Sequence, residues 1–150
     1  MHGSGGYILQ TLLSDTSCSV KTIRGEADPL FGGIHPEPIE LQLKLLSKTV
    51  LDSGSNLGVA TDGDADRLGI VDEKGSFIST LQILPLLLLD IYRNRGWRGK
   101  VAYTFSQSQL VERIASELGL ETFETPVGFK NVAQLMLENE ILIGGEESGG

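Results

Sequence analysis

Three aspartates stand at alternate positions in the segment Asp62-Gly-Asp-Ala-Asp66-Arg67, directly after the apolar run Leu57 to Thr61. Carboxylates held this close repel one another, so a cation between them would stabilise the arrangement. All the candidate ligands are oxygen atoms, which hard ions such as Mg²⁺ prefer. Arg67 follows at once, and a guanidinium beside a metal ion suggests a phosphate shared by the two.

Other interpretations of this acidic segment stay open on the residues alone. It could be a solvated acidic turn between two strands. Asp62, Asp64, Asp66 and Glu73 also have the ligand spacing of an EF-hand calcium loop, although Arg67 replaces the glycine that such a loop requires and the flanking segments are typical of strands. In a haloacid-dehalogenase-like phosphatase Asp62 would be a nucleophile, but no matching Gly-Asp segment and lysine follow downstream.

The composition narrows the class of protein. The chain has 150 residues, of which 40% are hydrophobic, enough for one ordinary domain or two small ones. A net charge of −8 argues against a nucleic-acid partner or an anionic membrane. Cys18 is the single cysteine, which predicts no internal disulfide and a reducing, cytoplasmic environment. The longest apolar stretch, Leu84 to Leu89, is too short to cross a bilayer.

The elements that must position these residues alternate between helix and strand. In the first half, the patterns predict a helix over Tyr7 to Leu13, a strand over Cys18 to Ile23, a helix from Pro38 to Leu51, and strands over Leu57 to Thr61, Leu68 to Val71 and Ser76 to Ser79. In the second half they predict a helix over Thr80 to Arg95, a strand over Val101 to Phe105, a helix capped by Ser106 and ending at Gly119, a strand over Leu120 to Glu124, a helix over Asn131 to Glu138 and a strand over Ile141 to Ile143. We therefore expect an α/β fold of two units, residues 1–79 and 80–150.

Three further segments stand out beside the acidic one. Met1 to Gly6 is a glycine-rich turn, Thr125 to Lys130 precedes a predicted helix, and Gly145 to Gly150 places a carboxylate and a hydroxyl in a glycine-flanked loop. In order and spacing, these segments and the acidic one resemble the α-D-phosphohexomutases, the phosphoglucomutase and phosphomannomutase family, over essentially the whole chain. The resemblance implies two mixed-sheet α/β units of the phosphohexomutase type, both incomplete.

The resemblance also implies roles for single residues. Asp62, Asp64 and Asp66 would bind Mg²⁺, with a phosphoserine from another domain as a further ligand. Arg67 would be catalytic, contacting that phosphoryl group.

The substrate would be held by residues of the second unit. Glu146 and Ser148 would bind sugar hydroxyls, with Gly128 in the neighbouring substrate loop. Lys130 would bind the substrate phosphate or assist proton transfer. A polar turn at Glu146 and Ser148, and a solvated lysine at Lys130, are the plainer alternatives.

The implied reaction interconverts a hexose 1-phosphate and a hexose 6-phosphate, of glucose or mannose, through a phosphoserine and a bisphosphate intermediate. No Ser-His-Asn segment for the phosphoserine and no Arg-x-Ser-Gly-Thr segment for the other phosphate occur in these residues. We therefore expect a middle fragment, domain 2 in part and most of domain 3, that is inactive without the remaining domains of a parent chain. The non-enzymatic alternative is a module that binds Mg²⁺, Ca²⁺ or a sugar phosphate.

Overall fold

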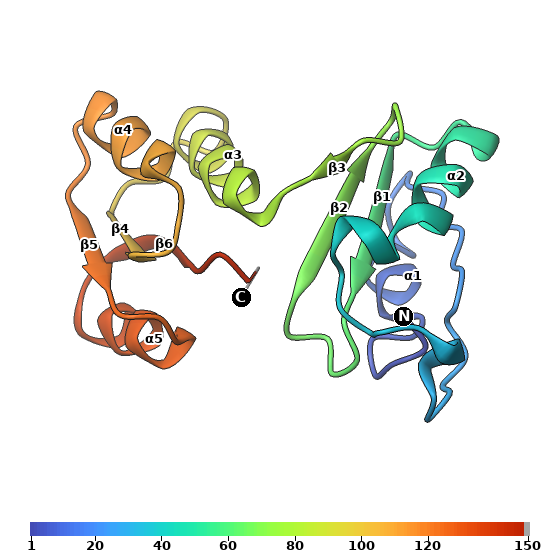
Figure 1. Cartoon of the computed structure of the whole chain (residues 1–150). Helices are drawn as coiled ribbons and strands as arrows, with labels where there is room; N and C mark the ends of the chain where they lie inside the picture. Colours follow the sequence, from blue (N-terminus) through green and yellow to red (C-terminus); the bar gives the residue numbers. More distant parts are fainter. Residues whose placement is uncertain (149–150) are drawn as a thin grey trace. The chain divides into compact units, whose positions relative to one another are not determined.

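The computed structural model describes residues 1–148, and the chain falls into two compact units, 1–78 and 79–150. Each unit has its own small sheet and its own helices (Figure 1). The expected α/β class is therefore confirmed. Within the described residues, no helix is both long and apolar enough to span a membrane.

The first unit is built on an antiparallel sheet with strand order β1-β2-β3. Its strands are β1 (Leu57–Thr61), β2 (Leu68–Asp72) and β3 (Phe77–Ile78). Thr61 is paired with Leu68, so the acidic segment is the loop of the β1–β2 hairpin. The helical elements are α1 (Ile8–Leu12), the 3₁₀ turns η1 (Phe31–Gly33) and η2 (Glu40–Gln42), and α2 (Lys44–Ser53).

Helix α2 covers this sheet, and the core of the unit lies between the two. Leu43, just before the helix, and Val50 within it pack with Val71 of β2, and all of these are buried. Burying such side chains favours folding by roughly 1.5–3 kcal/mol each. The hairpin that carries the acidic loop is thereby fixed against a helix.

The second unit is built on a parallel sheet with strand order β5-β4-β6. In chain order its elements are α3 (Thr80–Arg93), β4 (Lys100–Thr104), α4 (Gln109–Glu117), β5 (Thr122–Thr125), α5 (Phe129–Glu138) and β6 (Ile141–Gly145). Because the strands are parallel, the loops after β4, β5 and β6 all leave from the same edge of the sheet. Ligands of open α/β sheets bind at this carboxyl edge.

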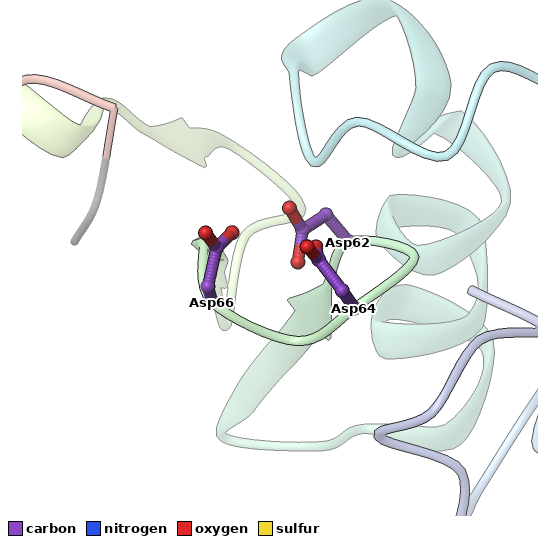
Figure 2. Close-up of side chains that lie close together, drawn as sticks. All are labelled: Asp62, Asp64 and Asp66. Carbon is purple, nitrogen blue, oxygen red and sulfur yellow. The ribbon is translucent and has the colours of Figure 1, made fainter.

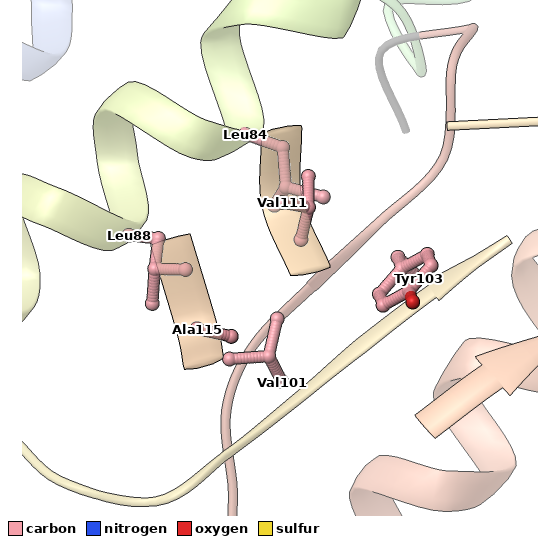
Figure 3. Close-up of a cluster of buried hydrophobic side chains, with 6 residues drawn as sticks. All are labelled: Leu84, Leu88, Val101, Tyr103, Val111 and Ala115. Atoms are coloured by element: carbon pink, nitrogen blue, oxygen red, sulfur yellow. The ribbon is translucent and has the colours of Figure 1, made fainter. Parts of the chain in front are cut away.

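The core of the second unit joins α3, α4 and the central strand β4. Figure 3 shows the buried side chains that meet there: Leu84, Leu88, Val101, Tyr103, Val111 and Ala115. β4 is buried along nearly its whole length, as expected for a central parallel strand. The loop after β4 therefore starts from the best-packed part of the unit.

Two local predictions are wrong, and a third is correct only in part. The structure has no strand at Cys18 to Ile23: half of these residues are exposed, none is buried, and the segment forms no ladder with another strand of the described residues. The cap of α4 is Ser108, whose Oγ accepts a hydrogen bond from the N–H of Leu110 at 3.2 Å, and not Ser106. The helix predicted from Pro38 starts as a 3₁₀ turn and becomes α-helical only at Lys44.

Candidate functional site

The aspartates of the β1–β2 loop converge. Each of Asp62, Asp64 and Asp66 offers a carboxylate oxygen, and these oxygens lie within 4.8 Å of one another (Figure 2). Asp62 is only 2% exposed, whereas Asp64 and Asp66 are exposed. A solvated acidic turn would not bury one of its carboxylates in this way. An all-oxygen donor set at this spacing fits a hard divalent cation such as Mg²⁺.

Arg67 closes the loop against the buried carboxylate. Its Nε lies 3.0 Å from Oδ2 of Asp62 and 3.7 Å from Oδ1 of Asp66, and its backbone N–H donates to Oδ1 of Asp62 at 3.2 Å. Its Nη1 also donates to Oε1 of Glu37 at 3.0 Å. The side chain of Arg67 is 40% exposed, so it pairs with these acids and is still accessible from the solvent.

The protonation of the loop follows from these contacts. Burial disfavours the charged form of Asp62, but the N–H of Arg67, the neighbouring Asp66 and the guanidinium together hold its pKa below the ordinary value. The hydrogen bond with Asp62, with burial and the nearby negative charges, raises the pKa of Asp66. Within the loop, Asp62 is therefore the more acidic of these two carboxyl groups.

The glycine-rich N-terminal turn touches the acidic loop. The N–H of Ser4 donates to the carbonyl of Gly63 at 2.9 Å, and a Cβ at Gly3 would lie 2.2 Å from that same oxygen. The N-terminal amino group of Met1 donates to the carbonyl of Thr61 at 3.1 Å. Only glycine permits this approach of two backbones, so two of the segments singled out in the sequence support each other.

The geometry does not fit an EF-hand. The acidic loop is flanked by antiparallel strands and not by helices. Glu73, which would complete the ligand set, follows the far end of β2, in the turn toward β3, and is not part of the carboxylate cluster. An EF-hand needs its twelfth-position glutamate at the ion.

The second unit brings together three of the residues predicted to bind substrate. Oε2 of Glu146 accepts a hydrogen bond from the N–H of Gly128 at 3.1 Å, and Oε1 accepts one from Oγ of Ser148 at 2.8 Å. The loops after β5 and β6 are thereby linked at the carboxyl edge of the sheet. Gly128 has φ +118°, which favours glycine. The last two residues of the predicted sugar-binding loop, Gly149 and Gly150, lie outside the described residues.

Lys130 lies apart from these contacts. It is an exposed residue in the first turn of α5, with a side chain that makes none of the hydrogen bonds joining Gly128, Glu146 and Ser148.

Glu147 lies between two of the predicted substrate-binding residues, and its contacts could not be foreseen from the sequence. Its carboxylate accepts hydrogen bonds from the hydroxyls of Thr104 and Ser106, which lie at the end of β4 and just beyond it. Its position between Glu146 and Ser148 was visible in the sequence, but its partners come from a distant segment.

Comparison with known proteins identifies the two units. Residues 1–75 match alpha/beta/alpha domain II of phosphoglucomutase/phosphomannomutase, and residues 81–150 match alpha/beta/alpha domain III. The chain belongs to the phosphoglucomutase/phosphomannomutase family. The resemblance seen in the sequence is confirmed.

Individual members of the family agree with this membership. The chain is 38% identical to a phosphoglucomutase/phosphomannomutase of Thermococcus kodakarensis over 149 residues, 99% of this chain and 32% of the relative. It is also 38% identical to a "probable phosphoglucosamine mutase" of Methanosarcina barkeri over 147 residues, 98% of this chain and 33% of the relative. The crystal structure of a "putative phosphomannomutase" of Thermus thermophilus superposes with a TM-score of 0.93 at 38% identity, over 99% of this chain and 35% of that one.

These shares mean that the chain spans about a third of the length of the relatives that it matches.

Proposed function

We propose that this chain supplies the metal-binding loop and the sugar-binding loop of a mutase that interconverts hexose 1-phosphate and hexose 6-phosphate. Residues 1–79 would be the C-terminal part of domain 2, and residues 80–150 most of domain 3. The observation that carries the proposal is the convergence of Asp62, Asp64 and Asp66 to within 4.8 Å in a unit that matches the family's domain II.

The reaction would pass through a phosphoserine and a bisphosphate intermediate, with the serine and the second phosphate-binding group supplied by other domains of a longer chain. Phosphoryl transfer of this kind depends mainly on positioning and on neutralising charge. The aspartates would hold Mg²⁺, which supplies electrostatic stabilisation of the phosphoryl oxygens. Arg67 would donate hydrogen bonds to the same phosphoryl group from the exposed side of its guanidinium.

The sugar would be oriented by the loops at the carboxyl edge of the second sheet. The carboxylate of Glu146 and the hydroxyl of Ser148 have the acceptors and donors that sugar hydroxyls need. Their contacts with each other and with Gly128 hold them in place before a ligand arrives. Lys130 would bind the substrate phosphate or move a proton at the sugar oxygen that receives the phosphoryl group.

Two classes of sugar phosphate are candidate substrates. Glucose and mannose phosphates are the first candidates, and a glucosamine phosphate is the second. The second is favoured by the name of the Methanosarcina barkeri relative, "probable phosphoglucosamine mutase". Glucosamine carries a cationic amine at the position where glucose and mannose differ, so an acidic loop such as Glu146–Glu147 suits it electrostatically.

A segment exchange tests the proposal. The matched segment of the Thermococcus kodakarensis relative is replaced by this chain, and turnover is measured with glucose, mannose and glucosamine 1-phosphates, Mg²⁺ and a hexose bisphosphate activator. The unmodified relative is the positive control. We expect turnover of at least one of the sugar phosphates. A folded exchange protein, checked by circular dichroism, that turns over none of them would contradict the proposal.

A further inference from the structure

Glu147 is tied to the rest of the second unit by both its side chain and its backbone. Its Oε2 accepts hydrogen bonds from Oγ of Ser106 and from Oγ1 of Thr104, the latter at 3.3 Å. Its carbonyl oxygen accepts a hydrogen bond from the hydroxyl of Thr80, the first residue of α3. Three hydroxyl groups from two separate segments therefore converge on one residue.

The partners of Glu147 are well fixed. Thr104 is fully buried and ends β4, the central strand of the sheet. Its hydroxyl also lies 3.1 Å from that of Ser106, so the two hydroxyls form one connected group. The carboxylate of Glu147, which accepts from these hydroxyls, is therefore anchored to the end of the buried central strand.

The neighbours of Glu147 have different contacts. Glu146 bonds to Gly128 in the loop after β5 and to Ser148, whereas Glu147 bonds to residues at the end of β4 and the start of α3. In the loop after β6, one acid is thus held by the end of β4 and the start of α3, and the acid and the hydroxyl on either side of it contact each other and the loop after β5.

We propose that Glu147 is a positioning residue, which fixes the backbone of residues 146–148 so that Glu146 and Ser148 present their oxygens to the sugar. This inference rests on the proposed function, in which Glu146 and Ser148 bind the sugar. Glu147 would affect sugar binding only through these two neighbours. The inference also predicts that Thr104, Ser106 and Thr80 matter for substrate binding without touching the substrate.

The charge of Glu147 agrees with this role. The hydrogen bond from Ser106 lowers the pKa of Glu147, against the effect of burial, so that the carboxylate is ionised at neutral pH. An ionised carboxylate only accepts hydrogen bonds, which matches partners that can all donate.

The test is made first on the 150-residue chain, by hydrogen exchange of the Gly128 amide, which reports the contact with Glu146. In Glu147→Leu we expect this amide to exchange about tenfold faster, as for the loss of a hydrogen bond to a charged group. Glu147→Gln keeps an oxygen acceptor and should stay within about threefold of the original chain. Glu117→Leu, a change at an exposed position of α4, is the matched control and should have no effect.

A second pair of changes guards against misfolding of Glu147→Leu. The double variant Thr104→Val, Ser106→Ala removes the donors and keeps Glu147, and it should accelerate Gly128 exchange to the same extent. An unchanged exchange rate in both folded variants would overturn the inference. Equal exchange rates in Glu147→Leu and Glu147→Gln would also overturn it, because they would mean that the hydrogen-bond acceptor of Glu147 is not needed.

The same variants are then placed in the segment-exchange enzyme. We expect kcat/KM to fall about tenfold for Glu147→Leu, as for the loss of a hydrogen bond to a charged group, and to be largely retained for Glu147→Gln, with both variants shown by thermal unfolding to be folded at the assay temperature. Unaltered kcat/KM in Glu147→Leu overturns the inference. An inactive exchange protein without any further change overturns the proposed function instead, and the exchange rates of Gly128 separate the two failures.

Discussion

Asp62 has an environment that its neighbours Asp64 and Asp66 do not share. It is 2% exposed and bonded to Arg67 by both the backbone and the guanidinium, whereas the other two carboxylates face solvent. Its removal therefore affects the fold of the loop as well as any bound cation. Asp64 makes the cleaner probe of the metal.

For Asp64→Asn we expect the affinity of the chain for Mg²⁺ to fall at least about tenfold, because one anionic oxygen ligand is lost. Thermal stability should stay within about 0.5 kcal/mol, as for most exposed positions. Calorimetric titration measures the first quantity and thermal unfolding the second. Asp52→Asn, an exposed change on α2, is the control. Equal Mg²⁺ affinities of the two variants would remove Asp64 from the metal site.

Asp62→Asn should behave differently. It leaves the backbone N–H and the guanidinium of Arg67 with a neutral partner, so we expect a loss of about 1–3 kcal/mol in the free energy of unfolding even without a cation. Chemical denaturation in the presence of a chelator measures this loss. A stability equal to that of Asp64→Asn would mean that the buried ion pair contributes nothing.

The pH dependence of stability has a sign that can be worked out at Glu147. Its pKa is lower in the folded chain than in the unfolded chain, chiefly through the hydrogen bond from Ser106. The folded state therefore binds the proton less readily, and this contribution to stability is complete above the unfolded pKa and lost as the pH falls through the folded pKa. We expect acid unfolding to be steeper in the original chain than in Glu147→Gln, as measured by denaturation at a series of pH values below about 5. Parallel curves for the two chains would contradict the shift.

At the scale of elements, the acidic loop depends on the turn that precedes α1. Backbone atoms of Gly3 and Gly63 approach so closely that a Cβ on Gly3 would lie 2.2 Å from the carbonyl oxygen of Gly63. The loop is thus held by the hairpin on one side and by the N-terminal turn on the other.

Gly3→Ala should therefore disturb the metal loop from outside it. We expect a loss of about 1–3 kcal/mol in stability, the usual range for overpacking, together with weaker Mg²⁺ binding. Ser4→Ala, at the exposed next residue, should change neither quantity. Retention of full Mg²⁺ affinity in Gly3→Ala would show that the two segments are independent.

The helices and strands could be predicted where the pattern of apolar residues within the segment is sufficient to define them. The β1–β2 hairpin and helices α3 and α5 follow from runs of apolar residues and their breaks, and the structure has them within a few residues of the expected ends. Cys18 to Ile23 has the alternation of a strand but no ladder partner in the described residues, and a strand is stabilised by a partner that local sequence does not reveal. Ser106 and Ser108 are equally good caps in sequence, and only the path of the chain after β4 decides for Ser108.

The candidate site also has a part that local sequence predicts and a part that it does not. The aspartates, Glu146 and Ser148 were found because their motifs are contiguous in the chain. The three aspartates converge to within 4.8 Å because they share the tight loop of a hairpin. Glu147 could not be given a role, because its hydroxyl partners Thr104 and Ser106 precede it by 43 and 41 residues.

At the scale of the whole molecule, the chain covers about a third of its relatives, and the sequence lacks the Ser-His-Asn and Arg-x-Ser-Gly-Thr segments of the family. We therefore expect the 150-residue chain by itself to have no mutase activity with glucose 1-phosphate and a bisphosphate activator. A coupled assay for glucose 6-phosphate checks this, with the full-length Thermococcus kodakarensis relative as the positive control. Substantial turnover by the chain alone would mean that it holds a complete site.

We propose above all that the acidic loop of this chain binds the metal ion of a phosphohexomutase. The most direct measurement compares turnover of the segment-exchange enzyme with and without Asp64→Asn, at saturating Mg²⁺ and with Asp52→Asn as the control. Removal of a group that positions a catalytic metal is predicted to lower kcat by at least about a hundredfold, while Asp52→Asn stays within about twofold of the unaltered exchange enzyme. Equal turnover of the Asp64→Asn enzyme and its unaltered parent would contradict the claim.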